Sequence, residues 1–343
     1  MLVDDIGSFP LPSAIKRETF EAAYRLARKH YLEGKPLRED AFVWQNFGTV
    51  TLEAFKMKLS AGLDVANYPQ QYDGVRQISE VIQQAMEKGT FTVEEKHAFL
   101  PEVQLIKEEA KHLSEDFKRK IQLRVCLFGP LELYLRGIGT VYYADVLNEY
   151  AETIRRFAKN SLLNTEYVET AVVSLDEPSF GYINIDAPKD DVASALEKAF
   201  SFKGATKQIH LHTPSRFAEL LAVEGIDVLS FEYAASPRNI ESVSPTMLAE
   251  VDKKIRVGIA RTDIDALAAE LQEKGVKNPA PEQYVEDETQ IRKRFLAAKQ
   301  KYGSLLTFTG PDCGLGSWPT QTAATLLLKR TVNAVRKAQD DAT

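Results

Sequence analysis

Short apolar segments rich in β-branched residues recur along the chain, and segments with helical periodicity lie between them. The apolar segments number about eight and cover residues 2–9, 62–68, 122–130, 171–178, 207–214, 227–233, 254–260 and 305–314. Amphipathic helical patterns cover residues 142–164, 214–225 and 320–338. Strands that alternate with helices in this way predict an α/β fold, a (β/α)8 TIM barrel. A doubly wound parallel sheet is the alternative, but it needs fewer strands and has no reason to close.

Two long stretches near the N-terminal half, residues 10–61 and 73–120, read as mostly helical. Each exceeds the length of one crossover between neighbouring strands, so we expect helical insertions that decorate the barrel. The chain contains no linker rich in Pro, Gly and Ser that would divide it. The sequence therefore predicts a single (β/α)8 catalytic domain over residues 1–343.

The composition, 44% hydrophobic and 27% charged, is that of a soluble globular protein. Lys and Arg total 43 against 49 Asp and Glu, and this net charge of −6 disfavours nonspecific binding to nucleic acid or anionic membranes. Two cysteines, Cys126 and Cys313, are too few for a disulfide framework and indicate a reducing compartment. Residues 1–13 lack signal-peptide character, and no apolar run reaches the ~18 residues of a membrane span. We therefore expect a cytoplasmic protein.

Polar side chains stand at the ends of the predicted strands, which is where barrels of this kind place their chemistry. They are Ser8, Asp176, Glu177, His210, His212, Glu232, Asp312 and Cys313. These residue types include good metal ligands and acid–base groups. Their position at strand ends, rather than on helix faces, directs attention to the mouth of the barrel.

His210 and His212 lie two residues apart on one predicted strand, so their side chains project to the same face. Taken alone, such a pair is more often structural; Glu232 alone fits a salt bridge as well as a ligand, and a lone buried cysteine such as Cys313 is common. Together they offer nitrogen, carboxylate and thiolate donors from three strand ends, a mixed set that Zn²⁺ accepts in tetrahedral geometry. Cys126, in the middle of a strand, is expected in the core.

Five motifs in order resemble the catalytic barrel of cobalamin-independent methionine synthase. They are "DDIGSFP" (4–10), "DEP" (176–178), "HLH" (210–212), "DVLSFE" (227–232) and "GPDCGLGSWP" (310–319). The resemblance covers nearly the whole chain. The length is similar to the short core form of that family, which lacks the additional N-terminal barrel of the long form.

The resemblance implies a zinc site made by His210, His212, Glu232 and Cys313. In this family zinc binds the thiol of homocysteine, favours its thiolate and presents the sulfur to a methyl donor.

The resemblance also implies a site for the amino-acid end of homocysteine. Ile6, Gly7 and Ser8 would contact that end of the substrate. Asp176 would hold the α-ammonium group, with Glu177 supporting it, and both are therefore candidate catalytic residues. The alternative for the two carboxylates is a buried ion pair.

Four positions depart from the family pattern. His212 stands where the family has a cysteine, and Gln70 stands where a glutamate binds the substrate amino group. Gln70 keeps a hydrogen-bond acceptor for the substrate but loses the charge. Arg261 lies near the position of a histidine that assists methyl transfer from folate, and Arg136 lies near that of a tryptophan that stacks on the folate.

These departures remove the residues that handle folate and mostly keep the homocysteine end of the site. Methyl transfer from folate is difficult because the leaving amine needs a proton, whereas Co(I) leaves a methyl-corrinoid without one. We therefore expect the methyl group to come from methylcobalamin, carried on a corrinoid protein, rather than from methyltetrahydrofolate.

Two other functions fit the residues. One is a methylcobalamin:thiol methyltransferase that acts on another thiol such as coenzyme M, since those relatives also keep a zinc site of this kind. The other is a non-catalytic partner that binds zinc or a corrinoid protein. A uroporphyrinogen decarboxylase fits poorly, because the chain has no arginine cluster before residue 16. Nucleotide-binding glycine motifs are absent after the predicted strands.

Overall fold

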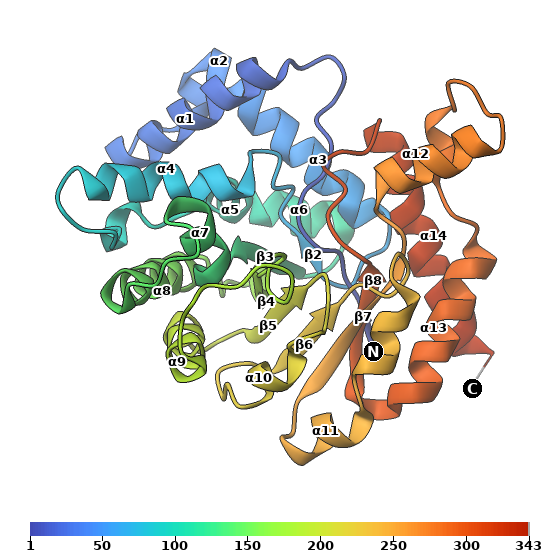
Figure 1. Ribbon diagram of the computed structural model, residues 1–343. Coiled ribbons are helices and arrows are strands. Elements are labelled where there is room, and N and C mark those ends of the chain that lie inside the picture. The colour runs from blue at the N-terminus through green and yellow to red at the C-terminus, as the bar shows by residue number, and fades with distance from the viewer. Residues whose placement is uncertain (342–343) are drawn as a thin grey trace.

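The computed structural model describes residues 1–341, and its strands form one parallel eight-stranded sheet (Figure 1). The strands are β1 (Leu2–Val3), β2 (Ala66–Asn67), β3 (Ile121–Phe128), β4 (Val168–Asp176), β5 (Thr206–Leu211), β6 (Val228–Phe231), β7 (Lys254–Ala260) and β8 (Leu306–Pro311). Their order is β1-β8-β7-β6-β5-β4-β3-β2. A parallel bridge between Asp4 and Val65 joins the two outer strands and closes the sheet. The predicted (β/α)8 barrel is confirmed.

Helices surround the sheet on its outer face (Figure 1). They are α1 (Arg17–Glu33), α2 (Ala41–Val43), α3 (Thr49–Ser60), α4 (Gly74–Met86), α5 (Pro101–Glu108), α6 (Ala110–Phe117), α7 (Pro130–Gly137), α8 (Ala144–Asn160), α9 (Lys189–Ala199), α10 (Phe217–Leu221), α11 (Pro245–Glu250), α12 (Ile264–Glu273), α13 (Glu288–Tyr302) and α14 (Gln321–Asp340). Helices α1 to α3 fall in the first predicted insertion and α4 to α6 in the second, which confirms their helical content.

Some elements are shorter than the sequence predicts. The segment 2–9 contributes only the two residues of β1, because the chain leaves the sheet after Asp4 and reaches Gly7, whose φ of +62° cannot continue a strand. The helix expected over 214–225 is limited to α10. Both differences lengthen the loops that follow strands, and these loops form the mouth of the barrel.

The inside of the barrel contains a fully buried ionic network. The Asp4 carboxylate accepts hydrogen bonds of 2.7 Å from Arg124 on β3 and of 2.7 Å from Arg256 on β7. Arg124 also donates to Gln208 on β5. Gly310 on β8 is required here, because a Cβ at this position would lie 1.9 Å from the Asp4 backbone oxygen. The network thus ties β3, β5 and β7 to the segment that follows β1.

The outward-facing strand residues are apolar and pack against the helices. On β7, for example, Ile255, Val257 and Ile259 are fully buried and alternate with the inward-facing Arg256. This alternation explains why the strands read as apolar runs with a few internal polar residues.

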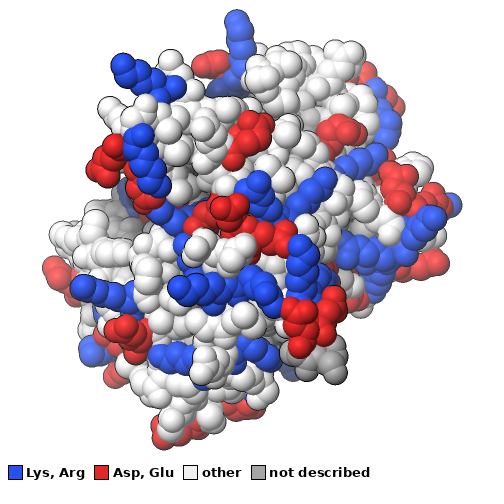
Figure 2. All heavy atoms as spheres, turned by 90° about the vertical axis from the view of Figure 1, so that its right-hand side faces the viewer, with Lys and Arg blue, Asp and Glu red and all other residues white. Residues whose placement is uncertain are grey.

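Charges of both signs lie side by side on the face that carries α12, α13 and α14 (Figure 2). Ion pairs here include Lys337 on α14 with Glu288 on α13, 2.5 Å apart, and Arg294 on α13 with Glu286, which precedes that helix, 2.7 Å apart. Because acidic groups neutralise the basic ones locally, this face presents a mixed rather than a basic surface.

Among residues 1–341, none of the helices combines the length and the apolar content needed to cross a membrane.

A buried carboxyl lies beneath the helices of the two insertions. Glu102, in the first turn of α5, is fully buried and accepts a hydrogen bond of 2.8 Å from Gln77. Its second oxygen has no hydrogen-bond partner among the described residues. Burial raises the pKa of Glu102 to about 8, since the charged form would lose its hydration.

We expect Glu102→Gln to increase the free energy of unfolding, relative to the parent, by more at pH 8 than at pH 5. Between about pH 4.5 and 8 the unfolded carboxyl has released a proton that the folded one retains, so folding stability falls as the pH rises through this window. The neutral amide removes that loss, which is on the order of a few kcal/mol. Urea unfolding at both pH values measures the difference. Glu115→Gln, at an exposed position, is the control, and parallel pH dependences for both variants would contradict the prediction.

Candidate metal centre

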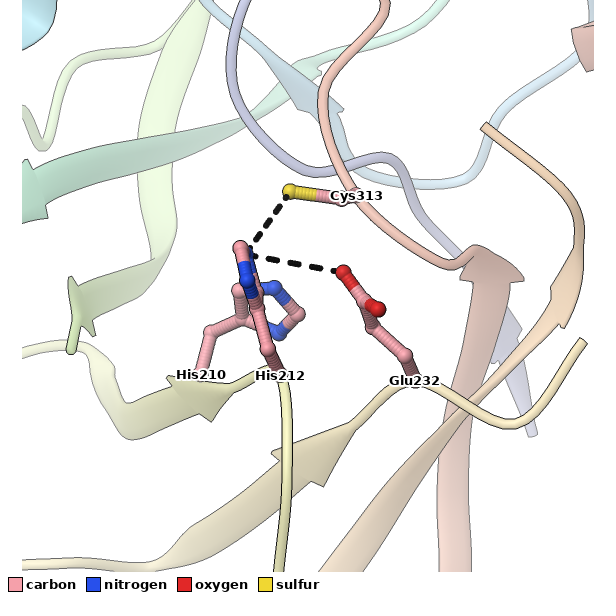
Figure 3. A group of neighbouring side chains, drawn as sticks. All are labelled: His210, His212, Glu232 and Cys313. Carbon is pink, nitrogen blue, oxygen red and sulfur yellow. Dashed lines mark hydrogen bonds and ion pairs between the residues drawn. The ribbon is translucent and has the colours of Figure 1, made fainter. Parts of the chain in front are cut away.

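Four predicted ligands come together at the mouth of the barrel. His210 lies at the end of β5, His212 and Glu232 directly follow β5 and β6, and Cys313 lies two residues after β8. Their side chains point toward one another (Figure 3), and one ligand atom from each lies within 4.8 Å of the other three. The residues meet because the carboxyl ends of parallel strands lie on the same rim of a barrel.

The spacing of the ligand atoms suits a tetrahedral ion. His212 Nε2 lies 3.6 Å from Cys313 Sγ and 3.5 Å from Glu232 Oε1. Ligands bonded to Zn²⁺ at ~2.0–2.3 Å in a tetrahedron are separated by about 3.3–3.8 Å. Both distances fall in that range, and the four ligand atoms all lie within 4.8 Å of one another, which is near the spacing of a tetrahedral zinc site.

His210 has one nitrogen free for an ion. Its Nδ1 lies 3.1 Å from the Ser230 hydroxyl, directly across on β6, whereas its buried Nε2 has no hydrogen-bond partner among the described residues. A proton on Nδ1, donated to Ser230 Oγ, would leave the lone pair of Nε2 available. This arrangement, with one nitrogen oriented by a neighbour, is typical of histidines that bind metals.

Burial disfavours the charged form of every side chain in the cluster. It raises the pKa of Glu232 to about 8, with Asp312 adding to the effect, and it also raises the pKa of the Cys313 thiol. It lowers the pKa of His210 and that of His212, so both imidazoles are neutral. Neutral imidazoles can bind a cation directly. A divalent ion would favour the carboxylate and the thiolate and thus offset the cost of burying them.

A cavity of about 400 Å³ opens beside the cluster and shares Cys313 with it. Every residue predicted to contact the substrate lines this cavity, except Glu177: Ile6, Gly7, Ser8, Gln70 and Asp176. The volume is sufficient for an amino acid of the size of homocysteine. A substrate in the cavity could therefore reach the cluster at Cys313.

The loop that carries Gly7 is held from two sides. The buried Lys58 ammonium and the Asn67 side-chain amide each donate to the Gly7 carbonyl oxygen over 3.1 Å. Ser8 Oγ accepts a hydrogen bond of 3.1 Å from the Gly316 backbone. The cavity wall formed by this loop is therefore preorganised.

Two polar side chains face the cavity from its floor and side. Asp176 is 8% exposed and accepts a hydrogen bond of 2.8 Å from Ser174, and burial raises its pKa to about 6, although Arg124 opposes the shift. Gln70 lines the cavity and adopts a left-handed conformation with φ of 45°, which is uncommon for a residue other than glycine. Both are available to a ligand.

Glu177 is engaged elsewhere. Its carboxylate oxygens accept hydrogen bonds from the backbone of Leu131, over 3.0 Å, and of Glu132, over 2.6 Å, in the first turn of α7. A carboxylate at this place stabilises the amino end of the helix. The side-chain hydrogen bonds of Glu177 are therefore with α7 and not with Asp176.

The residues at the folate-related positions are paired with acidic groups. The Arg261 guanidinium binds Asp263, at 2.6 and 2.9 Å, and Glu270, at 2.6 Å. Arg136 donates to Glu132 over 2.8 Å.

Two residues beside the cluster were not assigned a function from the sequence. Asp312 is one of the polar residues at the predicted strand ends, and its buried carboxylate accepts hydrogen bonds from the loop that follows Glu232. Asn239 lies in a short 3-10 helix, residues Pro237–Ser242, and its side chain contacts the backbone of two cluster residues. No sequence pattern marks Asn239, because its partners are backbone atoms of distant segments.

Comparisons with solved structures place the fold among known barrels. A B12-independent methionine synthase from Shewanella sp. W3-18-1, solved in complex with selenomethionine, is similar with a TM-score of 0.59 and 14% identity, covering 100% of this chain and 99% of that chain. An endo-beta-1,4-mannanase from Thermotoga petrophila has a TM-score of 0.42 and 10% identity, covering 81% and 72%. No protein-family model and no curated protein matches the sequence. At these identities the similarity to the methionine synthase establishes a shared fold.

We expect His210→Ala and Cys313→Ala each to lower zinc affinity by more than the roughly 10- to 100-fold that the loss of an outer contact costs, because each removes a ligand. Zinc content after dialysis against a weak chelator measures the effect. His112→Ala, at an exposed histidine, and Cys126→Ala, at the other thiol, should keep the parent content. Full zinc stoichiometry in a His210→Ala/Cys313→Ala double variant would refute the site.

Proposed function

We propose that this protein is a zinc-dependent methyltransferase, a single-domain barrel enzyme that methylates the thiol of homocysteine to form methionine in the cytoplasm. The observation that carries the proposal is the convergence of His210, His212, Glu232 and Cys313 within 4.8 Å at one end of the substrate cavity. A fold shared with a methionine synthase agrees with it.

The four side chains of the cluster would hold the zinc ion. Bound there, zinc would supply Lewis-acid chemistry that favours the thiolate form of the substrate sulfur. The chain contributes the orientation: Ser230 fixes the His210 ring, and Cys313 belongs to both the cluster and the cavity wall.

The cavity would orient the amino-acid end of homocysteine. Asp176, at the floor, offers a carboxylate for the α-ammonium group, and the preorganised loop of Ile6, Gly7 and Ser8 offers polar backbone groups. Gln70 would accept a hydrogen bond from the same ammonium without adding charge. These contacts hold the amino-acid end of the substrate, which is opposite to its sulfur. They therefore fix the direction in which the thiol points.

Three observations support a methyl-corrinoid donor over methyltetrahydrofolate. Arg261 remains protonated, since its acidic partners raise its pKa, and it cannot donate a proton to a leaving amine. Arg136 offers no aromatic face. Trp318 is 3% exposed and donates to the Thr262 backbone, so it is not available to stack on a folate ring.

The donor chemistry balances without an acid. The methyl–cobalt bond breaks, cobalt keeps the electron pair as Co(I), and the sulfur–carbon bond forms from the thiolate electron pair. The thiol proton leaves to solvent beforehand. Cys313 would contribute one thiolate and Glu232 one carboxylate, and the two imidazoles would stay neutral, so the ligands would just balance the charge of a dication. Such a site would activate the substrate sulfur less than one with a second thiolate. An activated donor tolerates this reduction.

The proposal predicts methionine formation from homocysteine and methylcobalamin, or a methyl-corrinoid protein, by zinc-loaded protein. Methionine is measured by mass spectrometry, with His210→Ala as the inactive control. Efficient turnover with methyltetrahydrofolate alone would overturn the donor assignment. Methylation of 2-mercaptoethanesulfonate in preference to homocysteine would instead favour the coenzyme M-type activity. Binding of zinc without methylation of any thiol would favour a non-catalytic partner.

We expect Asp176→Asn to raise the KM for homocysteine by about 10-fold or more, since the loss of a charge-assisted hydrogen bond costs ~1.5–3 kcal/mol. The KM for 2-mercaptoethanesulfonate, which has no ammonium group, should change little. Asp265→Asn, at an exposed position on α12, serves as the control. Equal KM values for Asp176→Asn and the parent would remove Asp176 from substrate binding.

A further inference from the structure

Two of the four cluster residues lie just beyond the regular part of the sheet. The last paired residues of β5 and β6 are Leu211 and Phe231, so His212 and Glu232 each follow the point where the ladder ends. Strand hydrogen bonds therefore do not fix their separation. Something else must hold the two side chains 3.5 Å apart in a loop region exposed to the cavity.

Asn239 provides one such restraint. It lies in the short helical turn η4 (Pro237–Ser242), and its side-chain Nδ2 donates to the His212 carbonyl oxygen over 2.9 Å and to the Glu232 carbonyl oxygen over 2.8 Å. One amide group thus joins the backbones of two cluster residues. This side-chain amide takes the place of the backbone hydrogen bonds that would join the two strands if their pairing continued by one residue.

Asp312 provides the second restraint. Its fully buried carboxylate accepts hydrogen bonds from three successive backbone amides, those of Tyr233 and Ala234 over 3.0 Å each and that of Ala235 over 2.6 Å. These amides directly follow Glu232, and Asp312 directly precedes Cys313. One side chain therefore ties the segment of the carboxylate ligand to that of the thiolate ligand.

The sequence makes room for this carboxylate. A Cβ at Gly258 on β7 would lie 2.2 Å from Asp312 Oδ1 and 2.6 Å from its Cα. Only glycine at position 258 leaves room for Asp312 to take this position. A third strand, β7, therefore also contributes to placing this carboxylate.

We propose that Asn239 and Asp312 are positioning residues that set the spacing of His212, Glu232 and Cys313 and thereby the affinity and geometry of the metal site. This inference rests on the proposed function, since it concerns the same cluster. Neither residue offers an atom to the four-ligand group; Asn239 acts through the backbone of two ligands, and Asp312 acts through the residues that follow Glu232. Loss of such an outer contact costs roughly 10- to 100-fold in metal affinity.

The chain contains a matched control for each residue. The Asn160 side-chain amide also donates to two backbone carbonyl oxygens, those of Glu95 over 2.7 Å and Ala98 over 2.9 Å. The Glu149 carboxylate also accepts from successive backbone amides, those of Phe91 over 2.6 Å and Thr92 over 3.0 Å. Both belong to α8 and lie outside the cluster.

The test compares Asn239→Asp and Asp312→Asn with Asn160→Asp and Glu149→Gln. Each change keeps the shape of the side chain but replaces a hydrogen-bond donor by an acceptor, or an acceptor by a donor. Zinc affinity is measured by competition with a chelator, and geometry by the visible and near-ultraviolet spectrum of the Co²⁺-substituted protein, which reports coordination and the thiolate bond. Thermal unfolding of the metal-free proteins measures the effect on folding alone. Asn239→Ala, which lacks the repulsion between carboxylate and carbonyl, replaces Asn239→Asp if that variant does not fold.

We expect zinc affinity to fall by about 10- to 100-fold and the Co²⁺ spectrum to shift in the Asn239 and Asp312 variants, but not in the controls. Parent affinity and an unchanged spectrum in both cluster variants would overturn the inference and leave the proposed function intact. Parent protein that binds zinc as expected but forms no methionine would overturn the proposed function and leave the positioning residues standing. Parent protein that binds neither Zn²⁺ nor Co²⁺ would overturn both.

Discussion

The buried Asp4 carboxylate is the contact on which the architecture of this barrel depends. The first two strands have two residues each, so backbone pairing alone gives the closing edge little strength. Asp4 adds to it with its own bridge to Val65 and with ion pairs to Arg124 and Arg256 on strands across the barrel. In a low-dielectric interior such pairs are strong only when their geometry and hydrogen bonds are good, which makes the closure specific. A closed barrel is what directs the strand ends to one mouth.

At that mouth the ligand cluster and the cavity lie side by side and share one residue. Cys313 belongs to the ligand cluster and also lines the cavity, so under the proposed function a substrate thiol and an ion would meet at its side chain. The cavity is polar at its floor, through Asp176, and rigid at its wall, through the loop held by Lys58. His210 is buried and the other three ligands are half-buried, and burial disfavours the charged form of Glu232, of Cys313 and of both imidazoles, which makes the cluster receptive to a dication.

The predictability of the site from sequence follows the kind of contact each residue makes. His210 and His212 were recognisable because a strand places alternate side chains on one face, and Glu232 and Cys313 because they follow other predicted strands. Glu177 shares the strand end of Asp176, but its carboxylate binds the first turn of α7, and no local pattern reveals that helix end as its partner. Asn239 and the partners of Asp312 were also hidden, since their contacts are with backbone atoms, which are the same in every sequence.

The sequence by itself determined the order of strands and helices, the parallel barrel and the identity of the four ligand candidates, because each follows from local periodicity and from the rule that strand ends carry the site. Only the tertiary structure decided that residues more than a hundred positions apart lie within 4.8 Å, that Glu177 turns toward a helix, and that a cavity lies beside Cys313. The reason is physical: periodicity is set by neighbours along the chain, whereas distances between loops are set by how the closed barrel packs.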